Sequence, residues 1–217
     1  MHAKVAKRIA QCLGRLSHAP FPSNIIQTLV MRIVAGKWRG KQIVAPKNLP
    51  VRPTTDMAKE SLFNLIRNYL NFEQIRALDL FSGTGNLSYE LASRGCSSIT
   101  SVDSSRDCIR FIHKTAAELP TSAIAPVASD AITFVQRSPS QWDLILADPP
   151  FDFDRYEALI DSILTGQRLT KNGIFVLEHG QFTSFVDHPN CFDRRKYGNV
   201  QLSFFQSEPL EEVDSEK

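Results

Sequence analysis

The chain of 217 residues, 42% hydrophobic and 22% charged, is long enough for one sizeable α/β domain with an appendage and too short for two large domains. No apolar run approaches the roughly 20 residues that a membrane-spanning helix needs, and the four widely spaced cysteines include no C-x-x-C pair, which argues against a zinc ribbon or a dithiol redox motif. We therefore expect a monomeric protein in a reduced cytoplasmic setting that binds neither metal nor membrane; its net charge is +2.

Basic residues are concentrated at the amino-terminal end. The first 55 residues contain ten Lys or Arg and no acid, whereas fifteen basic and twenty-three acidic residues follow from Asp56 onward. Such a basic arm can serve as a handle for phosphates, because each Lys or Arg near a nucleic-acid backbone releases condensed counterions. On charge alone, a merely solvated tail explains the pattern equally well. The organised pattern starts at Met31, so we treat residues 1–30 as a basic extension of open role or a start-site artefact.

Two β-prone segments, residues 32–36 and 41–45, flank the tetrapeptide Lys37-Trp38-Arg39-Gly40. This arrangement predicts a basic hairpin with an aromatic residue at its tip, and we assign residues 31–50 to it. Soon afterwards, Thr54 or Thr55 can cap a helix, because apolar residues recur at helical spacing over positions 58–69.

From residue 77 onward, β-prone and helical segments alternate. The expected strands span residues 77–81, 98–102, 124–127, 143–147, 174–177 and 201–206. The expected helices span residues 87–94, 105–118, 130–137 and 155–164. This alternation predicts an α/β domain over residues 51–206, with a parallel sheet, helices on both faces and a ligand site at the carboxyl ends of the strands. We expect the acidic residues 207–217 to form a disordered tail.

The first motif after a strand is Asp79-Leu80-Phe81-Ser82-Gly83-Thr84-Gly85. Glycines at such a corner let the backbone approach a ligand closely, and the helix that follows offers unpaired N–H groups at its amino end. A dinucleotide fingerprint would place a third glycine where Ser88 stands, and it would not ask for an acid at position 79. Taken alone, the segment is also compatible with a tight turn that binds nothing.

Acids follow the next two expected strands as well. Asp103 ends the second strand, where an acid in nucleotide-binding folds accepts hydrogen bonds from the two ribose hydroxyls. Asp130 follows the third strand, where its carboxylate can meet the exocyclic amine of an adenine. A helix cap is the alternative role of Asp130, since Asp is a preferred first residue of helices.

The discriminating motif is Asp148-Pro149-Pro150-Phe151, which follows the fourth expected strand. Consecutive prolines hold the chain extended and leave backbone carbonyls without competing local N–H donors. An exocyclic amine on a base is a poor nucleophile. If Asp148 and the Pro149 carbonyl accept its two hydrogens, its lone pair is turned toward an incoming methyl group, while Phe151 stacks on the base. The motif therefore predicts amino methylation of a base, with a post-strand turn and a core phenylalanine as the alternative.

In order, these motifs resemble those of class I S-adenosylmethionine-dependent methyltransferases, and D-P-P-F resembles their amino-methylating signature. Three further stretches narrow the resemblance to the bacterial RsmD-type 16S ribosomal RNA guanine-N2 methyltransferases, which act on guanine 966. The stretches are Met31-Arg-Ile-Val-Ala-Gly-Lys-Trp-Arg-Gly-Lys, Arg52-Pro-Thr-Thr-Asp-Met-Ala-Lys-Glu-Ser-Leu-Phe-Asn and Lys196-Tyr-Gly. The resemblance covers residues 31–206 and leaves the first 30 residues unexplained.

The resemblance implies a Rossmann-like, mostly parallel seven-stranded sheet with a reversed last strand, and a small basic amino-terminal β-hairpin that helps to hold RNA. It implies S-adenosyl-L-methionine as cofactor and 16S rRNA, in an assembled or assembling 30S particle, as partner. The implied cofactor-binding residues are Arg52, Thr54, Thr55, Asp79, Phe81, Ser82, Gly83, Gly85, Asp103 and Asp130. The implied RNA-binding residues are Arg32, Lys37, Trp38, Arg39 and Lys41. The implied catalytic residues are Asp148, Pro149, Pro150 and Phe151. Departures from the family pattern occur at Ser82 and Thr84 and over residues 57–59.

Other functions stay open at this point. The same chemistry can serve adenine or cytosine in DNA, or a glutamine amide in a protein, and only the resemblance separates RNA from DNA. An NAD-dependent dehydrogenase is disfavoured by the missing third glycine and by D-P-P-F. A non-catalytic RNA-binding or ribosome-assembly protein is disfavoured by the intact acids. No cysteine lies in a nucleophile motif, so we expect direct in-line methyl transfer without a covalent enzyme intermediate, on a guanine that is unstacked or single-stranded.

Overall fold

The computed structural model describes residues 28–46, 49 and 55–208. The predictions made for Arg52 and Thr54 therefore lie outside the described residues, as do most of those for residues 1–30 and 207–217. Within the described part, no helix is long and apolar enough to cross a membrane, and no group of three or more His, Cys, Asp or Glu residues is arranged to hold a metal ion.

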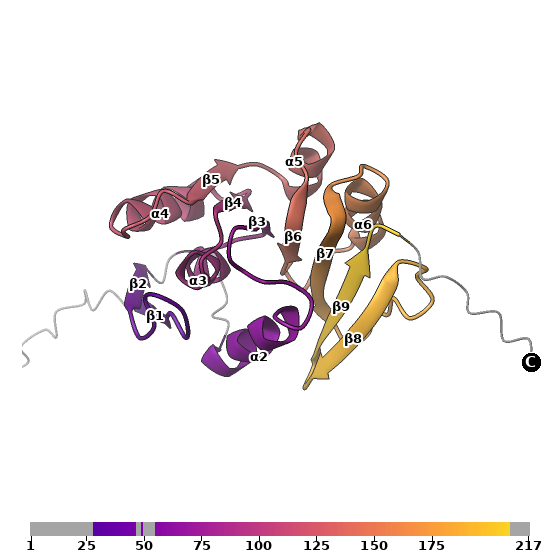
Figure 1. Ribbon diagram of the computed structural model, residues 1–217, viewed down its shortest axis with the longest axis horizontal. Coiled ribbons are helices and arrows are strands. Elements are labelled where there is room, and N and C mark those ends of the chain that lie inside the picture. Colours follow the sequence, from indigo (N-terminus) through magenta and orange to yellow (C-terminus); the bar gives the residue numbers. More distant parts are fainter. Residues whose placement is uncertain (1–27, 47–48, 50–54, 209–217) are drawn as a thin grey trace, which may run out of the picture.

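A seven-stranded sheet forms the centre of the molecule, and a separate two-stranded hairpin lies at its side (Figure 1). The hairpin strands are β1 (Thr28–Arg32) and β2 (Gln42–Pro46). The sheet strands are β3 (Arg76–Leu80), β4 (Ser98–Asp103), β5 (Ile124–Ala128), β6 (Trp142–Ala147), β7 (Leu169–Gly180), β8 (Cys191–Tyr197) and β9 (Val200–Gln206). The described helices are α2 (Asp56–Ile66), α3 (Asn86–Arg94), α4 (Arg106–Ala117), α5 (Ala131–Arg137) and α6 (Tyr156–Leu164).

The strand order is β5-β4-β3-β6-β7-β9-β8. Strands β3 to β7 pair in parallel, and β9 runs antiparallel to both β7 and β8. This is the mostly parallel sheet with a reversed last strand that the resemblance implies, so the expected fold class is confirmed. Strands β4 and β5 lie on one side of β3, and β6 and β7 lie on the other, so the strand order reverses between β3 and β6. Ligands of such sheets bind at this switch point, beyond the carboxyl ends of the strands.

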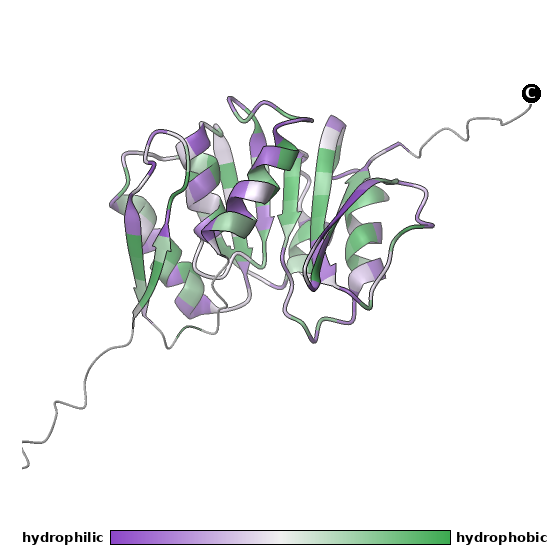
Figure 2. Ribbon diagram, turned by 90° about the horizontal axis from the view of Figure 1, so that it is seen from below, coloured by the Kyte–Doolittle hydropathy of each residue, from purple (hydrophilic) through white to green (hydrophobic). Residues whose placement is uncertain are grey.

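Two hydrophobic cores cover the two faces of the sheet. Along β6, Leu146 faces the core beneath α2, α3 and α4, whereas Ile145 and Ala147 face the core beneath α5 and α6. Strands that are buried on both faces have continuous apolar sequences instead of alternating apolar and polar residues, and residues 144–147 of β6 follow this rule. Figure 2 shows these hydrophobic strands between helices with more hydrophilic outer surfaces.

The structure corrects two sequence expectations. The first hairpin strand ends at Arg32, where the expected strand began, because the backbone amides of Val34 and Ala35 donate to Glu90 instead of to a neighbouring strand. In addition, β8 was missed. Its last four residues are exposed, since β8 is the edge strand of the sheet, and they lack the apolar pattern on which strand prediction depends.

Candidate active site

Few residue types fit the turn between β3 and α3, because of its backbone conformation and its close neighbours. Phe81, Gly83 and Gly85 all have positive φ, at 59°, 52° and 81°. A Cβ on Gly85 would lie 2.9 Å from both Tyr89 and Ile112, so a glycine is needed there for space as well as for conformation. Gly85 also leaves the amino end of α3 without a side-chain cap, so N–H groups of its first turn stay available to a ligand.

Asp103 joins this turn to the end of β4. Its carboxylate accepts the Gly83 amide at 2.8 Å and the Ser105 amide at 2.8 Å, which fixes the carboxyl group beside the glycine-containing turn. The structure therefore brings the first two sequence motifs together, as the parallel sheet predicted.

Asp79 is fully buried at the end of β3. The Ser88 hydroxyl donates to its carboxylate at 2.5 Å, and the hydroxyls of Ser88 and Ser101 lie 2.6 Å apart. Burial is the main cause that raises the pKa of Asp79 to about 7; the Ser88 hydrogen bond opposes the rise, and the charges of Asp148 and Asp103 contribute to it. The acids that end β3, β4 and β6 are thus close enough to influence one another.

Asp130 caps α5. Its carboxylate accepts the Thr133 amide at 2.9 Å and pairs with the Arg155 guanidinium at 2.9 Å. Partial burial raises the pKa of Asp130, but the hydrogen bonds from Thr133 and Arg155 outweigh it, and the net shift is downward. The capping role weighed from sequence is confirmed, and recognition of adenine stays a prediction.

The Asp148–Phe151 loop continues directly from β6. Pro149 is buried and Phe151 is 72% exposed. The Pro150 carbonyl accepts the Phe153 amide at 2.9 Å, whereas no amide within the described chain donates to the Pro149 carbonyl. Asp148 lines a small cavity together with Leu62, Leu87 and Glu178. An acid, a carbonyl to which no amide of the described residues donates and an exposed aromatic ring therefore follow one another along this loop.

Sequence reasoning missed Phe153 and Tyr156, two aromatic residues that support this loop. The Phe153 ring packs edge-on against Phe81 at 5.2 Å and against Tyr156 at 5.1 Å. Burial, and after it the charge of Asp148, raises the pKa of the Tyr156 phenol. Phe153 thus connects the loop after β6 to the turn after β3. The only sequence signal for Phe153 and Tyr156 is their position just after D-P-P-F.

The basic hairpin presents part of its charge to solvent. Lys37, Arg39 and Lys41 are exposed, whereas Trp38 is half-buried and packs against the core beside α3 instead of projecting from a tip. Arg32 is exposed but pairs with Asp56 at 2.7 Å. Thr55, assigned to the cofactor pocket by resemblance, caps α2 by accepting the Ala58 amide at 3.2 Å.

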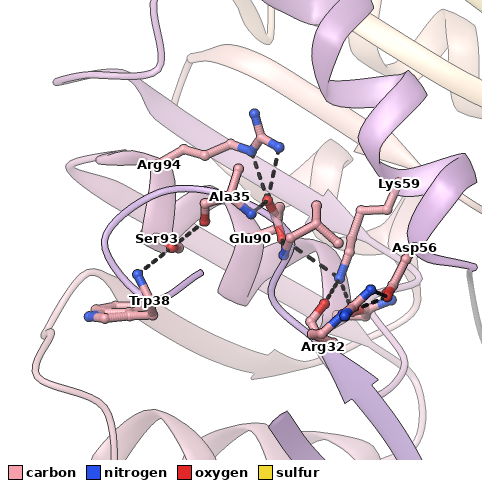
Figure 3. Close-up of polar contacts among 10 residues, drawn as sticks. Arg32, Ala35, Trp38, Asp56, Lys59, Glu90, Ser93 and Arg94 are labelled. Carbon is pink, nitrogen blue, oxygen red and sulfur yellow. Dashed lines mark hydrogen bonds and ion pairs between the residues drawn. The ribbon is translucent and has the colours of Figure 1, made fainter. Parts of the chain in front are cut away.

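Glu90 of α3 holds the turn of the hairpin on the domain (Figure 3). Its fully buried carboxylate accepts the amides of Val34 and Ala35 at 2.9 and 3.0 Å and pairs with Arg94 at 2.9 Å. It also lies 3.6 Å from the ammonium group of Lys59. We refer to the Glu90 contacts with Val34 and Ala35 as the hairpin clasp.

Lys59 is buried beside the clasp and reaches α3 as well as the hairpin. Its ammonium group donates to the Arg32 carbonyl at 2.6 Å and to the Asn86 side-chain oxygen at 2.8 Å. Burial lowers the pKa of Lys59, and the charge of Glu90 partly restores it. Thr84 of the glycine-containing turn also contacts Met31, with its hydroxyl 3.0 Å from the sulfur. The hairpin is therefore bonded to the same segment that forms the candidate cofactor site.

A parallel sheet with a reversed last strand, acids at the ends of β3 and β4, and an Asp-Pro-Pro-Phe loop after β6 together define a class I methyltransferase. The chain belongs to the family described as Conserved hypothetical protein 95, whose model matches residues 31–206. The resemblance to the RsmD-type proteins is confirmed by the relatives that follow.

Several relatives carry the name ribosomal RNA small subunit methyltransferase D, among them proteins from Escherichia coli and Haemophilus influenzae. The protein from Escherichia coli K12 is 32% identical over 189 residues, which is 86% of this chain and 94% of the relative. The protein from Haemophilus influenzae is 29% identical over 152 residues, 68% of this chain and 78% of the relative.

Solved structures share the fold. The Escherichia coli protein yhhF superposes with a TM-score of 0.72 at 25% identity, covering 83% of this chain and 99% of its own. The Thermus thermophilus 16S rRNA N2 G1207 methyltransferase, solved with AdoMet and guanosine, gives a TM-score of 0.63 at 20% identity over 84% of this chain and 50% of its own.

Proposed function

We propose that this protein transfers a methyl group from S-adenosyl-L-methionine to the exocyclic N2 of a guanine in 16S ribosomal RNA, at position 966 by family resemblance. The observation that carries the proposal is the Asp148–Phe151 loop at the end of β6, beside the acids that end β3 and β4. The relatives named as small-subunit rRNA methyltransferases support the substrate class.

The residues at the carboxyl ends of β3 and β4 fit the cofactor. The Ser82 hydroxyl is buried without a hydrogen-bond partner among the described residues, so it can serve a ligand. Asp103 would hold the ribose hydroxyls, and the backbone of the turn around Gly83 and Gly85 would pass close to the cofactor. When bound, the cofactor supplies an electrophilic methyl group on a sulfonium. The acidic surroundings of Asp79, Asp103 and Asp148 suit that positive charge.

The chain's own part in the reaction is to orient the amine. Asp148 and the Pro149 carbonyl accept the two N2 hydrogens, which directs the nitrogen lone pair at the methyl group and stabilises the positive charge that develops on nitrogen. Phe151 provides an exposed face on which the unstacked guanine rests.

The exposed side chains of Lys37, Arg39 and Lys41 would contact RNA phosphates next to this site. A 30S particle, assembled or assembling, is the proposed setting, and the cytoplasm is the proposed location of a monomeric enzyme. Asp130 is proposed to meet the adenine amine of the cofactor in addition to capping α5.

The deciding experiment incubates the purified protein with methyl-labelled S-adenosylmethionine and, in parallel, naked 16S rRNA, 30S particles and duplex DNA. We expect label in the RNA or the particle, recovered as N2-methylguanosine after digestion, and none with Asp148→Ala. Label in DNA, label in protein, or no transfer to any substrate by cofactor-bound protein would each contradict the proposal.

A further inference from the structure

The β8–β9 turn projects from the edge of the sheet that carries the candidate active site. Ala147, the last residue of β6, pairs with Leu177, whereas β7 continues to Gly180, which pairs with Val200 of β9. The turn at Gly198 is therefore about three residues, or roughly 10 Å, beyond the end of β6. Strand β9 is two strand spacings from β6, which is also about 10 Å.

This turn carries basic charge that pairs with no acid among the described residues. Arg194 and Lys196 are exposed, and within the described residues neither forms an ion pair with an acid. They pair across the sheet with Ser203 and Gln201 and therefore project from the same face. Arg195 differs, because it pairs with Asp193 at 2.6 Å.

An exposed aromatic side chain lies beside this charge. Phe182, just beyond the end of β7, is 96% exposed. The loop of Phe182 is held against β9, because the Gln201 side chain donates to the carbonyls of Gln181 and Thr183 at 3.2 and 3.3 Å. Gln201 is also the cross-strand partner of Lys196, so the aromatic ring and the ammonium group are carried on neighbouring backbone.

We propose that Phe182, Arg194 and Lys196 form a second RNA-binding surface, which we term the carboxyl-terminal platform. Cations that pair with no described acid, beside an exposed ring, suit a single-stranded nucleic acid, whose phosphates contact the charges and whose bases stack on the ring. In Figure 1 α2 lies between the β1–β2 hairpin, at the left, and the β8–β9 turn, at the lower centre. The RNA is thus held on both sides of the Asp148–Phe151 loop, and its target nucleotide is presented between the two contacts. This inference rests on the proposed function.

The test compares the salt dependence of binding to a naked 16S rRNA fragment for three variants. Arg194→Ala/Lys196→Ala should reduce the slope of the logarithm of the RNA-binding constant against the logarithm of salt concentration, by at most the contribution of about two phosphate contacts. The variant should also have a higher KM for RNA. The matched control is Arg137→Ala/Lys171→Ala, which removes the same charge from exposed positions at the end of α5 and near the amino end of β7. The third variant, Lys37→Ala/Arg39→Ala/Lys41→Ala, reports on the hairpin. Calorimetric binding of S-adenosylmethionine verifies that each variant is folded.

Phe182→Ala should weaken RNA binding by roughly fivefold or more, and Phe182→Trp should preserve it, since only a stacking face is required. The platform is refuted if the Arg194/Lys196 variant keeps the parental slope while the parent protein binds and methylates the RNA. It is also refuted if that variant binds naked RNA normally and loses affinity only for 30S particles, which would indicate a protein contact. If the parent neither binds nor methylates RNA, the proposed function fails, and the platform with it.

Discussion

The amide of Gly83 lies 2.8 Å from the carboxylate of Asp103, so the turn after β3 is bonded to the end of the neighbouring strand. A glycine-containing turn with positive φ would otherwise be free to adopt several conformations. The hydrogen bond selects one of them and leaves the amino end of α3 aimed at the candidate cofactor site. Asp103 thus has a structural task in addition to its expected contact with the ribose.

Replacing Asp103 by Ala should weaken S-adenosylmethionine binding by roughly 1–3 kcal/mol, because the ribose hydroxyls lose their acceptor and the Gly83 amide loses its partner. Isothermal titration calorimetry measures the change. Asp107→Ala, which removes an exposed acid in the first turn of α4, is the control and should bind normally. An unchanged dissociation constant in folded Asp103→Ala would remove this residue from the site.

Asp148 and Phe151 should give different kinetic phenotypes. Asp148→Ala should keep cofactor affinity nearly intact and lower the rate of methyl transfer at least a hundredfold, about 3 kcal/mol, because Asp148 orients the nitrogen during attack. Phe151→Ala should mainly weaken binding of the target guanine, by roughly 1–3 kcal/mol, and Phe151→Tyr should be tolerated. Single-turnover kinetics separate the two effects. A parental transfer rate in cofactor-bound Asp148→Ala would contradict the proposed mechanism.

Asp79 should make the apo protein less stable as the pH rises. Its folded-state pKa of about 7 exceeds the ordinary value of 3.8, so the folded state binds the proton more tightly than the unfolded state does. The stabilisation from this group is complete below about pH 4 and is lost as the pH rises to about 7, at up to about 1.4 kcal/mol per pH unit.

Urea unfolding of the parent and of Asp79→Asn at pH 5 and pH 8 measures this contribution. The drop in unfolding free energy between the two pH values should be smaller in the variant, because an amide does not titrate. Asp107→Asn controls for loss of an exposed acid. Equal drops in the parent and Asp79→Asn would show that Asp79 is already charged at pH 5.

Gly36 should be far less replaceable than Gly40. Both have positive φ, but a Cβ on Gly36 would lie 2.0 Å from the Ser93 carbonyl oxygen, whereas a Cβ on Gly40 meets nothing within 4 Å. That same carbonyl accepts the Lys37 amide at 2.8 Å. Gly40→Ala should cost about 1–2 kcal/mol for the left-handed conformation, and Gly36→Ala should cost at least about 1 kcal/mol more. Chemical denaturation compares the two variants; equal losses would mean that the hairpin does not rest on α3 in solution.

The basic hairpin should act on RNA affinity. Replacing Lys37, Arg39 and Lys41 together should reduce the salt dependence of the RNA-binding constant, by at most the contribution of about three phosphate contacts. Cofactor affinity should be retained, because these side chains are exposed and the clasp uses backbone amides of other residues. Filter binding at several salt concentrations gives the slope, and a slope equal to that of the parent would mean that the three residues merely face solvent.

The sheet and the place of the site were predictable because they depend on local pattern and chain order. Apolar runs mark buried parallel strands, and the carboxyl ends of such strands meet at one edge, so Asp79, Asp103 and Asp148 could be expected near one another before any coordinates. β8 was not predictable, since an exposed edge strand containing Arg194 and Lys196 has a composition like that of a surface loop.

Contacts between distant segments were likewise beyond the sequence. Nothing in the pattern of α3 indicates that Glu90 receives hairpin amides, because a helical Glu ordinarily faces solvent and its burial depends on packing against residues 55 positions away. The same is true of Arg155, which could have paired with any nearby acid and meets Asp130 only because α5 and α6 pack side by side.

The hairpin clasp also sets an order of events during synthesis. Val34 and Ala35 lie 56 and 55 residues before Glu90. At a synthesis rate of about 5–20 residues per second, the two amide donors are therefore made roughly 3–11 s before the Glu90 carboxylate that accepts from them. When Glu90 is added, the growing chain carries all ten basic charges of its first 55 residues and only four acids that precede Glu90. The nascent protein therefore gains attraction for nucleic acid before it has a site in which to use a methyl donor.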